Sequence, residues 1–533
     1  MRDVKDNRPA RDIGSRTRTT TAVMVGAARG AAVAVLSAAA LAVAPGTVAA
    51  QAPSRVIDLT LETMVDLALS SSYQVRQLNL DIDRTRLNLK AERARLRSRV
   101  DMEVSAPDLR SISENLWNSD LGRYEIIQEN SRRFEAELSI RQPVILLGHP
   151  TNGYLSLNNR VYRYTQVGEG GEQDQRYYNR AFVEYTQPLF QPNELRNDIE
   201  EAELELEDSE LGFYEDVVEI VDDVSQDYFE LFEEAYGEEV NGAHVANLEA
   251  AGAAAEEVAR ADSSRAIDVG QIRVELANAR EQLQQSRSGF RLEATRLKTR
   301  LDIPEGDSIT LTPVITIMPI TIDPEAAVAL AFELTPRMRQ LGISHREDEL
   351  DLEQTKGRGG VQIDLSVSYG REMQDPVFQQ MWSRPTNTYT VGVNGEIPIW
   401  DWGERRARID ASRISLQQTQ LRIEQAETDI RASVQNEIRN VAEYQSRALA
   451  MQDNLRLAGE LAEESLRRYR LGDVSALDLL QSFRREVDTA ENLLDAYLGW
   501  KRAISELQEM TFFDFERGLP VLERFGIELQ PAT

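Results

Sequence analysis

The chain contains no cysteine and only three histidines among its 533 residues. The absence of cysteine excludes disulfide bonds, thiolate metal sites and a lipid-modified N-terminal cysteine. His149, His244 and His345 lie far apart without the spacing of a metal site, so we expect ordinary surface or packing roles for them. No glycine-rich phosphate loop follows a strand-like segment, and no nucleophile motif occurs. The sequence therefore predicts no enzyme active site, no metal site and no cofactor.

Basic residues are scarce relative to acidic ones. The chain has 60 Lys and Arg against 89 Asp and Glu, a formal net charge of -29. A surface this acidic repels nucleic acid, so no nucleic-acid partner is expected. Residues 200–239 contain 18 acidic residues and no Lys or Arg. A solvated helix face would explain most of these acidic groups. Adaptation to a salty habitat, or a wall that attracts cations, are the alternative explanations for the excess.

Long apolar runs are also missing, apart from one near the N-terminus. Residues 1–50 combine a positively charged start, an apolar run at 31–44 and a small-residue cleavage site after Ala50, which together predict a signal peptide. Met24 is an alternative start of translation. The apolar run is shorter than the ~20 residues that a membrane helix needs. We therefore expect an exported chain without transmembrane helices.

The remaining chain is two copies of one plan. Residues 65–78 align with 328–341 at an offset of 263, whereas Pro188 aligns with Pro398 at an offset of 210. The difference, 263 - 210 = 53 residues, is an insertion in the first copy. We expect the following organisation: first repeat 51–302 with an inserted hairpin at 107–180 and a helical hairpin at 190–302, linker 303–322, second repeat 323–512 and C-terminal tail 513–533.

Each copy combines alternating strands with unusually long helices. Residues 361–370 and 389–399 alternate apolar and polar side chains, as in an outer-membrane barrel strand or a half-exposed soluble sheet. Apolar spacings of three and four predict single helices over 192–261 and 401–471, each about 105 Å long. Shorter helices are expected over 323–358 and 475–510. The chain would thus descend in one helix and return in two.

Four motifs carry a family resemblance. They are "LTLETMVDLAL" near the start, "QPLF" and "IPIWDWGERRARI" where strands meet helices, and "YRLGDVSALDLLQSF" near a hairpin turn. With these motifs in this order, the chain resembles the TolC-like outer-membrane efflux proteins. The resemblance implies an α+β membrane protein, a trimeric β-barrel continued by a long periplasmic α-helical barrel, with two structural repeats per protomer.

The resemblance also implies a function and a location. The chain would be a passive exit duct in the outer membrane, with a large periplasmic part, in a tripartite efflux or type I secretion system. Its partners would be two further copies of itself, a periplasmic adaptor (membrane fusion) protein, an inner-membrane pump of the RND, ABC or MFS type, and outer-membrane lipid. The alternative is a soluble periplasmic coiled-coil scaffold, against which the signal peptide and the strand-to-helix junctions speak.

The strand-to-helix junctions provide the first candidate residues. Proline cannot donate to a sheet ladder, so we expect Pro188 and Pro398 to end their strands where the chain leaves the membrane. Trp400 and Trp402 are expected in the aromatic girdle of the membrane interface.

The hairpin turns provide the second set. Asp268 and Asp478 occupy equivalent positions in the two copies. The resemblance implies that they line the periplasmic entrance, that Tyr469 helps to hold it shut, and that Gly472 and Asp473 form the turn that contacts the adaptor. Capping of the returning helices is the alternative role for both aspartates.

The chain departs from the family pattern in three places. Val474 stands where the family often has an arginine, and Asp262 stands where the second copy has Gly472. The insertion, with its "LGHPTNG" connection, is either an extracellular hairpin or a pair of extra strands. Extra strands would give 3 × 6 = 18 barrel strands instead of 12.

Overall fold

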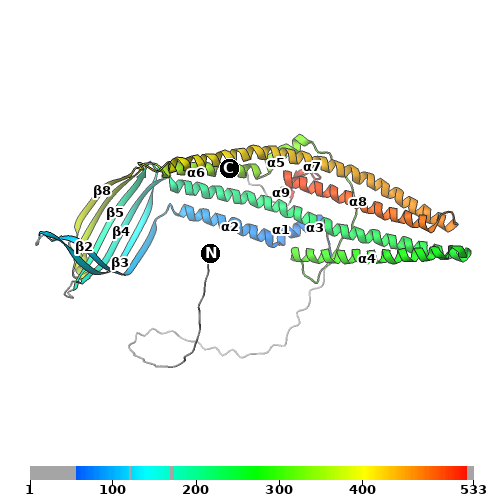
Figure 1. Ribbon diagram of the computed structural model, residues 1–533, viewed down its shortest axis with the longest axis horizontal. Coiled ribbons are helices and arrows are strands. Elements are labelled where there is room, and N and C mark those ends of the chain that lie inside the picture. The colour runs from blue at the N-terminus through cyan, green and yellow to red at the C-terminus, as the bar shows by residue number, and fades with distance from the viewer. Residues whose placement is uncertain (1–55, 119–121, 168–172, 525–533) are drawn as a thin grey trace, which may run out of the picture. The chain divides into compact units, whose positions relative to one another are not determined.

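A computed structural model describes residues 56–118, 122–167 and 173–524 (Figure 1). These residues belong to one structural unit, Ser54–Thr533. The expected signal peptide lies outside the described residues. Within them, no helix carries an apolar stretch long enough to cross a membrane.

Six antiparallel strands form one sheet in the order β2-β3-β4-β5-β7-β8. Their bounds are Arg99–Asn118, Arg123–Leu146, His149–Val167, Gln173–Leu189, Gln362–Asp375 and Thr386–Glu396. Strands β3 and β4 come from the insertion and lie between β2 and β5. The insertion therefore extends the sheet by two strands, which decides between the two alternatives.

The sheet has one apolar and one polar face, because side chains alternate along each strand. One row of cross-strand neighbours on the apolar face consists of Val100, Ile140, Leu157, Val183, Tyr369 and Tyr389. A row on the polar face consists of Glu103, Glu137, Arg160, Arg180, Glu372 and Thr386. The alternation expected for 361–370 thus holds across all six strands.

The predicted strand 389–399 ends too late. Strand β8 ends at Glu396, which pairs with Gln362, the first residue of β7, so the residues beyond have no partner to bond to. Pro398 lies two residues past this end and does not terminate the strand itself. Pro188, by contrast, is the penultimate residue of β5 and pairs with Asp364.

Two helices of 68 residues continue from the sheet, α3 (Glu194–Ala261) and α7 (Glu404–Leu471). At 1.5 Å per residue each is about 102 Å long. The C-terminal half of α3, remote from the sheet, packs against α4 (Ala266–Arg300) and α8 (Ala476–Thr511). The N-terminal half of α3, next to the sheet, packs against α2 (Tyr73–Ala94) and α6 (Arg337–Arg358). The predicted descent in one helix and return in two is confirmed (Figure 1).

The predicted helix 323–358 is divided. It forms α5 (Pro324–Leu334) and α6, with Thr335 and Pro336 between them. Proline disfavours the helical conformation of the residue before it, and Thr335 is extended. The first repeat shows the same division between α1 (Leu61–Ser71) and α2 at Ser72.

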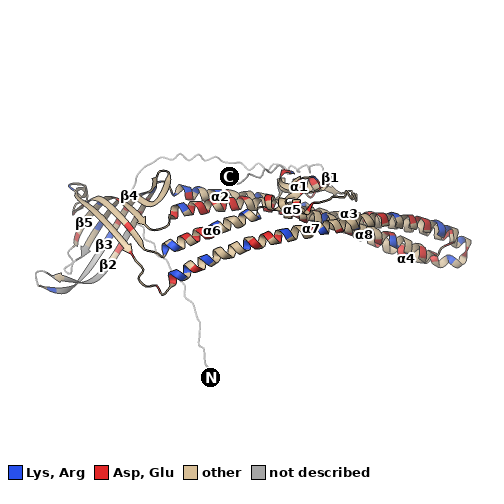
Figure 2. Ribbon diagram, turned by 90° about the horizontal axis from the view of Figure 1, so that it is seen from above, with Lys and Arg blue, Asp and Glu red and all other residues tan. Residues whose placement is uncertain are grey.

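Arginines on the neighbouring helices pair with the acidic segment of α3. Figure 2 colours the charged residues along these helices. The inter-helix ion pairs are Arg86–Glu210, Arg93–Glu203 and Arg95–Asp198 to α2, Arg339–Glu207 and Arg346–Glu200 to α6, and Arg300–Asp223, Arg300–Asp227 and Arg287–Glu238 to α4. Exposed pairs of this kind contribute only about 0–1 kcal/mol each. They nevertheless give many of these acids a partner on another helix, which a purely solvated face would not.

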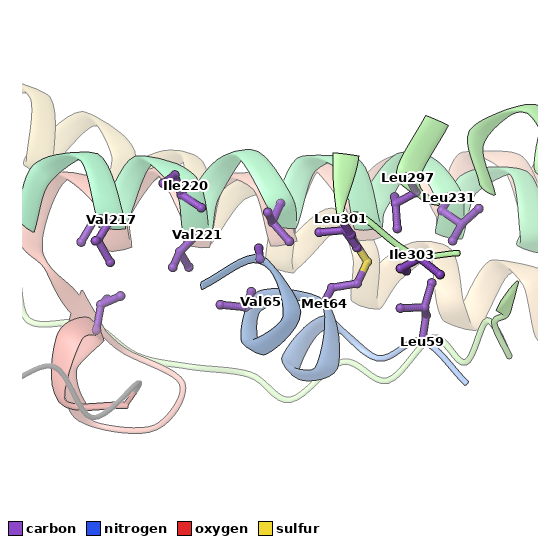
Figure 3. Packing of buried hydrophobic residues seen from close by; sticks show 14 of the residues in the cluster. Leu59, Met64, Val65, Val217, Ile220, Val221, Leu231, Leu297, Leu301 and Ile303 are labelled. Carbon is purple, nitrogen blue, oxygen red and sulfur yellow. The ribbon is translucent and has the colours of Figure 1, made fainter. Parts of the chain in front are cut away.

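The connections between the repeats pack midway along the helices. Strand β1 (Val56–Asp58) pairs in parallel with β6 (Ser308–Thr310) of the linker. Beside this pair, Met64 of α1 is fully buried among Leu231, Leu297 and Leu301 (Figure 3). The first strand and the linker thus pack, together with α1 and α4, into one hydrophobic cluster with α3.

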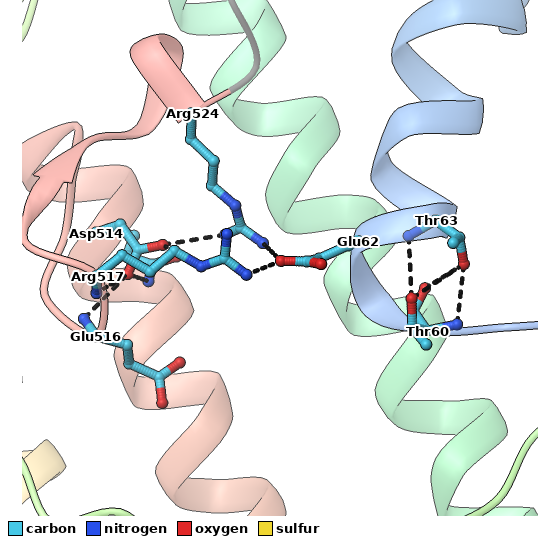
Figure 4. A network of polar contacts seen from close by, with 8 residues as sticks. Thr60, Glu62, Thr63, Asp514, Glu516, Arg517 and Arg524 are labelled. Carbon is cyan, nitrogen blue, oxygen red and sulfur yellow. Dashed lines mark hydrogen bonds and ion pairs between the residues drawn. The ribbon is translucent and has the colours of Figure 1, made fainter.

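The start of the C-terminal tail is docked onto this core. It contains β9 (Phe513–Asp514), β10 (Leu519–Pro520) and α9 (Val521–Arg524). Asp514 is buried and accepts hydrogen bonds from the backbone N–H groups of Glu516 and Arg517 and from Arg524 (Figure 4). Arg517 and Arg524 also pair with Glu62 of α1. This network joins the first helix of the chain to its last.

Candidate functional site

The two helical hairpins turn by different means. The first turn is the 3-10 helix η1 (Ser263–Arg265), in which Asp262 Oδ1 accepts hydrogen bonds from Ser264 N and Oγ. These bonds hold the pKa of the Asp262 carboxyl below its usual value. The second turn uses Gly472 at φ 86°, with Asp473 N–H bonded to the carbonyl of Arg468. Glycine adopts this left-handed conformation without strain, so the second helix ends in a Schellman motif.

Asp478 caps the returning helix α8. Its Oδ2 accepts a hydrogen bond of 2.7 Å from Ser475 Oγ, while Ser475 Oγ accepts one of 3.2 Å from Asp478 N–H. Together with the bond from Ser475 N–H to Asp478 Oδ2 they form a capping box. The capping alternative is therefore confirmed for Asp478, which also remains exposed at the tip.

Asp268 is placed differently, between the two hairpins. Tyr469 of α7 is fully buried, and its hydroxyl donates to Asp268 Oδ2 over 3.1 Å. Arg265 Nε lies 3.3 Å from the same Oδ2, and Arg265 Nη2 donates to the carbonyl of Val474 over 2.9 Å. The Arg265 guanidinium also lies 5.4 Å from the centre of the Tyr469 ring. We call Arg265, Asp268, Tyr469 and the Val474 carbonyl the tip latch.

The tip latch rests on a small-residue core. Around Tyr469 pack buried residues of α3, α4, α7 and α8: Leu248, Ala251, Ala254, Ala255, Ile272, Ala279, Ala462, Ala476, Leu479 and Phe483. The many alanines allow the four helices to approach closely. Burial, reinforced by the Asp268 charge and hydrogen bond, raises the pKa of Tyr469 to about 12. The phenol therefore stays protonated at physiological pH and can donate.

Arg265 is the functional residue that sequence reasoning missed. The family arginine is absent at Val474, but Arg265 reaches the Val474 backbone from the opposite hairpin. The available signal was its position three residues before Asp268, a spacing at which helical side chains meet. The expected equivalence of Asp268 and Asp478 holds for their place in the repeat but not for their surroundings.

The junction of β5 with α3 also holds the inserted turn. Asn193 caps α3 by accepting from Arg196 N–H, and its Nδ2 donates to the carbonyl of Pro150 over 2.6 Å. Asn152 Nδ2 donates to the carbonyl of Pro192. The "LGHPTNG" connection therefore lies beside the helices, and of the two alternatives for the insertion the pair of extra strands is the one present. Because the insertion forms a full antiparallel pair, its central turn returns to the helix end of the sheet.

The junction of β8 with α7 exposes both tryptophans. Asp401 accepts from the backbone N–H groups of Gly403 and Arg405, which starts the helix at Glu404. This turn holds Trp402 at φ 55° and leaves Trp400 and Trp402 73% and 90% exposed, with ring centres 5.4 Å apart. Two solvent-facing indoles packed edge to face would be costly in water alone.

The histidines behave as separate side chains. His244 is buried in α3, where burial lowers the pKa of its imidazole, and His345 lies 3.8 Å from Glu349 on the same helix. His149 opens β4. Among the residues that the structure describes, no group of three or more His, Cys, Asp and Glu is arranged to hold a metal ion.

The six-stranded sheet and the long helical hairpins resemble those of known proteins. The profile of the outer membrane efflux protein family matches residues 343–511, nearly all of the second repeat. The fold is that of the outer-membrane efflux channels. The resemblance read from the motifs is thereby confirmed, and the combination of a sheet with long helical hairpins is the one these channels share. No curated protein matches the chain.

Three solved structures illustrate the likeness. The chain has a TM-score of 0.62 to CusC at 15% identity, over 87% of this chain and 95% of CusC. It has a TM-score of 0.61 to the outer membrane protein VceC of Vibrio cholerae at 11% identity, over 85% and 95% of the two chains. For the CmeC outer membrane channel of Campylobacter jejuni the values are 0.58, 11%, 88% and 90%. The fold is therefore shared over almost the whole described chain at very low identity.

Proposed function

We propose that three copies of this chain form a passive exit duct through the outer membrane and periplasm, as part of a tripartite efflux or type I secretion system. The observation that carries the proposal is the six-stranded sheet with one apolar face, which continues directly into helices of 68 residues. A barrel strand needs lipid on one side and water on the other. Helices of about 100 Å then extend the wall beyond the membrane.

Assembly follows from the free edges of one chain. The outer strands β2 and β8 each have one partner in the sheet, so both leave a ladder edge open. Three six-stranded sheets joined through β2 and β8 give 18 strands and no free edge. The helices offer matching edges, because α4 exposes Ile267 and Val274 while the tip-side part of α7 exposes Leu457 and Leu461. In the trimer α4 of one copy packs against α7 of the next.

The strand-to-helix junctions mark the membrane interface on the periplasmic side. Trp400 and Trp402 lie there, together with exposed Leu147 on the inserted turn and Phe190 after β5. Aromatic and apolar side chains at this level anchor a barrel in the headgroup region. Pro188 and Pro398 belong to the same belt, one at the end of its strand and one just beyond it.

The tip latch holds the periplasmic entrance closed. It links the first hairpin to the second within one chain, so its release frees the hairpins to separate. Gly472 and Asp473 are exposed at the tip, where an adaptor (membrane fusion) protein can contact them. The adaptor would couple the duct to an inner-membrane pump of the RND, ABC or MFS type. The energy comes from that pump, and the duct itself carries out no covalent chemistry.

Two neighbouring residues of β7 test the proposal. Val367 is on the apolar face and Ser368 on the polar face. We expect Val367→Asp to abolish trimers in the outer-membrane fraction, whereas Ser368→Asp assembles and conducts in planar bilayers. A wild-type chain that purifies as a monodisperse monomer without detergent would overturn the duct and support the coiled-coil scaffold.

A further inference from the structure

Charged side chains are distributed unequally between the two faces of the sheet. On the polar face, Arg160 pairs with Glu135 and Glu137, and Arg133 pairs with Glu135. The apolar face carries three arginines, Arg132 of β3, Arg163 of β4 and Arg371 of β7, none of which makes an ion pair in the described part of the chain. Asp375 shares this face, but β5 separates it from Arg163, and its Oδ1 accepts from Val377 N–H.

The three arginines lie toward one end of the apolar face, on the side remote from the helices. On each strand the arginine stands two positions from an apolar side chain of that face: Arg371 after Tyr369, Arg163 after Val161 and Arg132 beyond Phe134. On β7, Met373 follows Arg371 on the same face. Compared in strand register, the arginine of β4 lies farther from the helices than that of β7, and the arginine of β3 lies farther still. Because barrel strands are tilted, residues at one depth in a membrane are offset in register in this way. We call these residues the arginine row.

The arginine row lies at the edge of the sheet remote from the helices. On β7, Arg371 lies eight residues, or about 27 Å along the strand, from Ile363 near the helices. With a strand tilt of about 40° this is roughly 21 Å of height, close to the ~25 Å apolar band of outer-membrane barrels. The exposed tryptophans mark the opposite boundary. The row therefore faces the outer leaflet.

The local chemistry favours an anion from the membrane. Arg163 lies over the Phe134 ring, 4.4 Å from its centre, and its Nε is buried without a hydrogen-bond partner. A guanidinium over an aromatic ring keeps donors for a further partner, and its fork matches phosphate oxygens. Tyr177, the cross-strand neighbour of Arg163, places an interfacial aromatic beside it. A carboxylate could have filled this place, as on the polar face, but none does so in the described strands.

We propose that the arginine row binds phosphate groups of a phosphorylated glycolipid, lipopolysaccharide, in the outer leaflet. This inference rests on the proposed outer-membrane location. The arginines come from separate strands, so they suit a headgroup with more than one phosphate, or neighbouring lipids, better than a single free anion. The contact would stabilise the two inserted strands β3 and β4 at their outer ends, where the sheet extends beyond the apolar band.

The test compares two triple variants of the full-length trimer. Arg132→Gln, Arg163→Gln and Arg371→Gln remove the arginine row. Arg99→Gln, Arg141→Gln and Arg176→Gln remove the same charge from the polar face of β2, β3 and β5. Detergent-purified trimers are titrated with bisphosphorylated lipid A, with dephosphorylated lipid A, with phosphatidylglycerol and with inorganic phosphate, and bound lipid and thermal stability are measured.

We expect wild type and the polar-face variant to bind bisphosphorylated lipid A at least about tenfold more tightly than the row variant. Dephosphorylated lipid A and inorganic phosphate should bind all three weakly. Equal lipid A binding by both variants would overturn the proposal, and equal wild-type affinity for phosphatidylglycerol would overturn the choice of glycolipid. An Arg→Lys version of the row, which keeps charge but loses the fork, should give intermediate binding and guards against misfolding. A chain that never enters the membrane would instead refute the proposed function.

Discussion

The two hairpin tips are built on one plan and differ in what they contribute. The second turn ends its helix with Gly472 and starts the next helix with a capping box. The hydrogen bonds of these turn residues therefore go to the backbone of the same hairpin. The first turn has no such glycine, and its Arg265 and Asp268 point instead to the second hairpin. An internal repeat thus preserves helix lengths and turn positions, while one copy specialises in local capping and the other in the contact between copies.

The largest difference should come from Tyr469, which only the second copy has. Tyr469→Ala removes a fully buried ring as well as the hydroxyl donor, and such truncations cost about 3–5 kcal/mol. We expect a higher open probability in single-channel records. Tyr469→Phe keeps the ring and should open the channel less. If Tyr469→Ala leaves the records unaltered, the ring has only a packing role.

The equivalent positions Arg265 and Ser475 give the sharpest comparison of the two turns. Arg265→Ala removes the ion pair with Asp268 and the bond to Val474, so the hairpins should separate and conductance should rise. Ser475→Ala removes a cap worth about 1 kcal/mol and should lower stability without changing conductance. Equal conductance in these two variants would show that the latch does not involve Arg265.

Substitutions of the two aspartates should have different effects on block by multivalent cations. Asp478 is exposed and unpaired with any cation in the described chain, whereas Asp268 is next to Arg265. If the tips converge in the trimer, periplasmic-side cations should block conductance by Coulomb attraction, less at high salt. Asp478→Asn should relieve this block more than Asp268→Asn. Asp268→Ala with Asp478→Ala should abolish it in intact trimers; an unchanged block there would place the entrance elsewhere.

Alkaline pH should act on the tip latch through Tyr469 alone. Its pKa is raised from 10.0 to about 12, so the folded tip favours the protonated phenol. The associated stability is complete below pH 10 and is lost as the pH rises toward 12. We expect wild-type open probability to rise over this range and Tyr469→Phe to stay flat. Parallel curves for both proteins would assign the effect to other groups.

The smallest effects should come from exchanging the turn residues themselves. Gly472→Ala places a side chain at φ 86° and should cost about 1–2 kcal/mol. Asp262→Gly removes the bonds to Ser264 at a residue with φ -134°, where glycine gains nothing. Thermal unfolding of the trimer should fall modestly in both cases with conductance retained. Stabilisation by Asp262→Gly would mean that the two turns are interchangeable.

Much of the fold was predictable because its helices and strands follow from the periodic spacing of apolar residues in the sequence. The long helices follow from apolar spacings of three and four, and the barrel-type strands follow from strict alternation between lipid and water faces. The repeat offsets placed the insertion between residues 106 and 181, where β3 and β4 now complete the sheet. The end of β8 was misplaced because a strand stops where its partner stops, and that depends on register.

The site was only partly predictable for a related reason. Tyr469, Asp268 and Asp478 could be named from their motifs, but nothing local distinguished the two aspartates. Arg265 meets Val474 across 209 residues of sequence, and Tyr469 meets Asp268 across 201. Such contacts exist only once α3, α4, α7 and α8 have packed together.

The sequence by itself determined the elements of this protein: two repeats, their long helices and two-faced strands, and the polar turns between them. These depend on neighbours within a few residues, whose preferences the chain carries in any context. Tertiary structure decided which acid became a cap and which a latch, and that the central turn of the insertion lies at the helices. It also placed Arg132, Arg163 and Arg371 on one face of the sheet, because only the pairing of strands brings residues of three strands together.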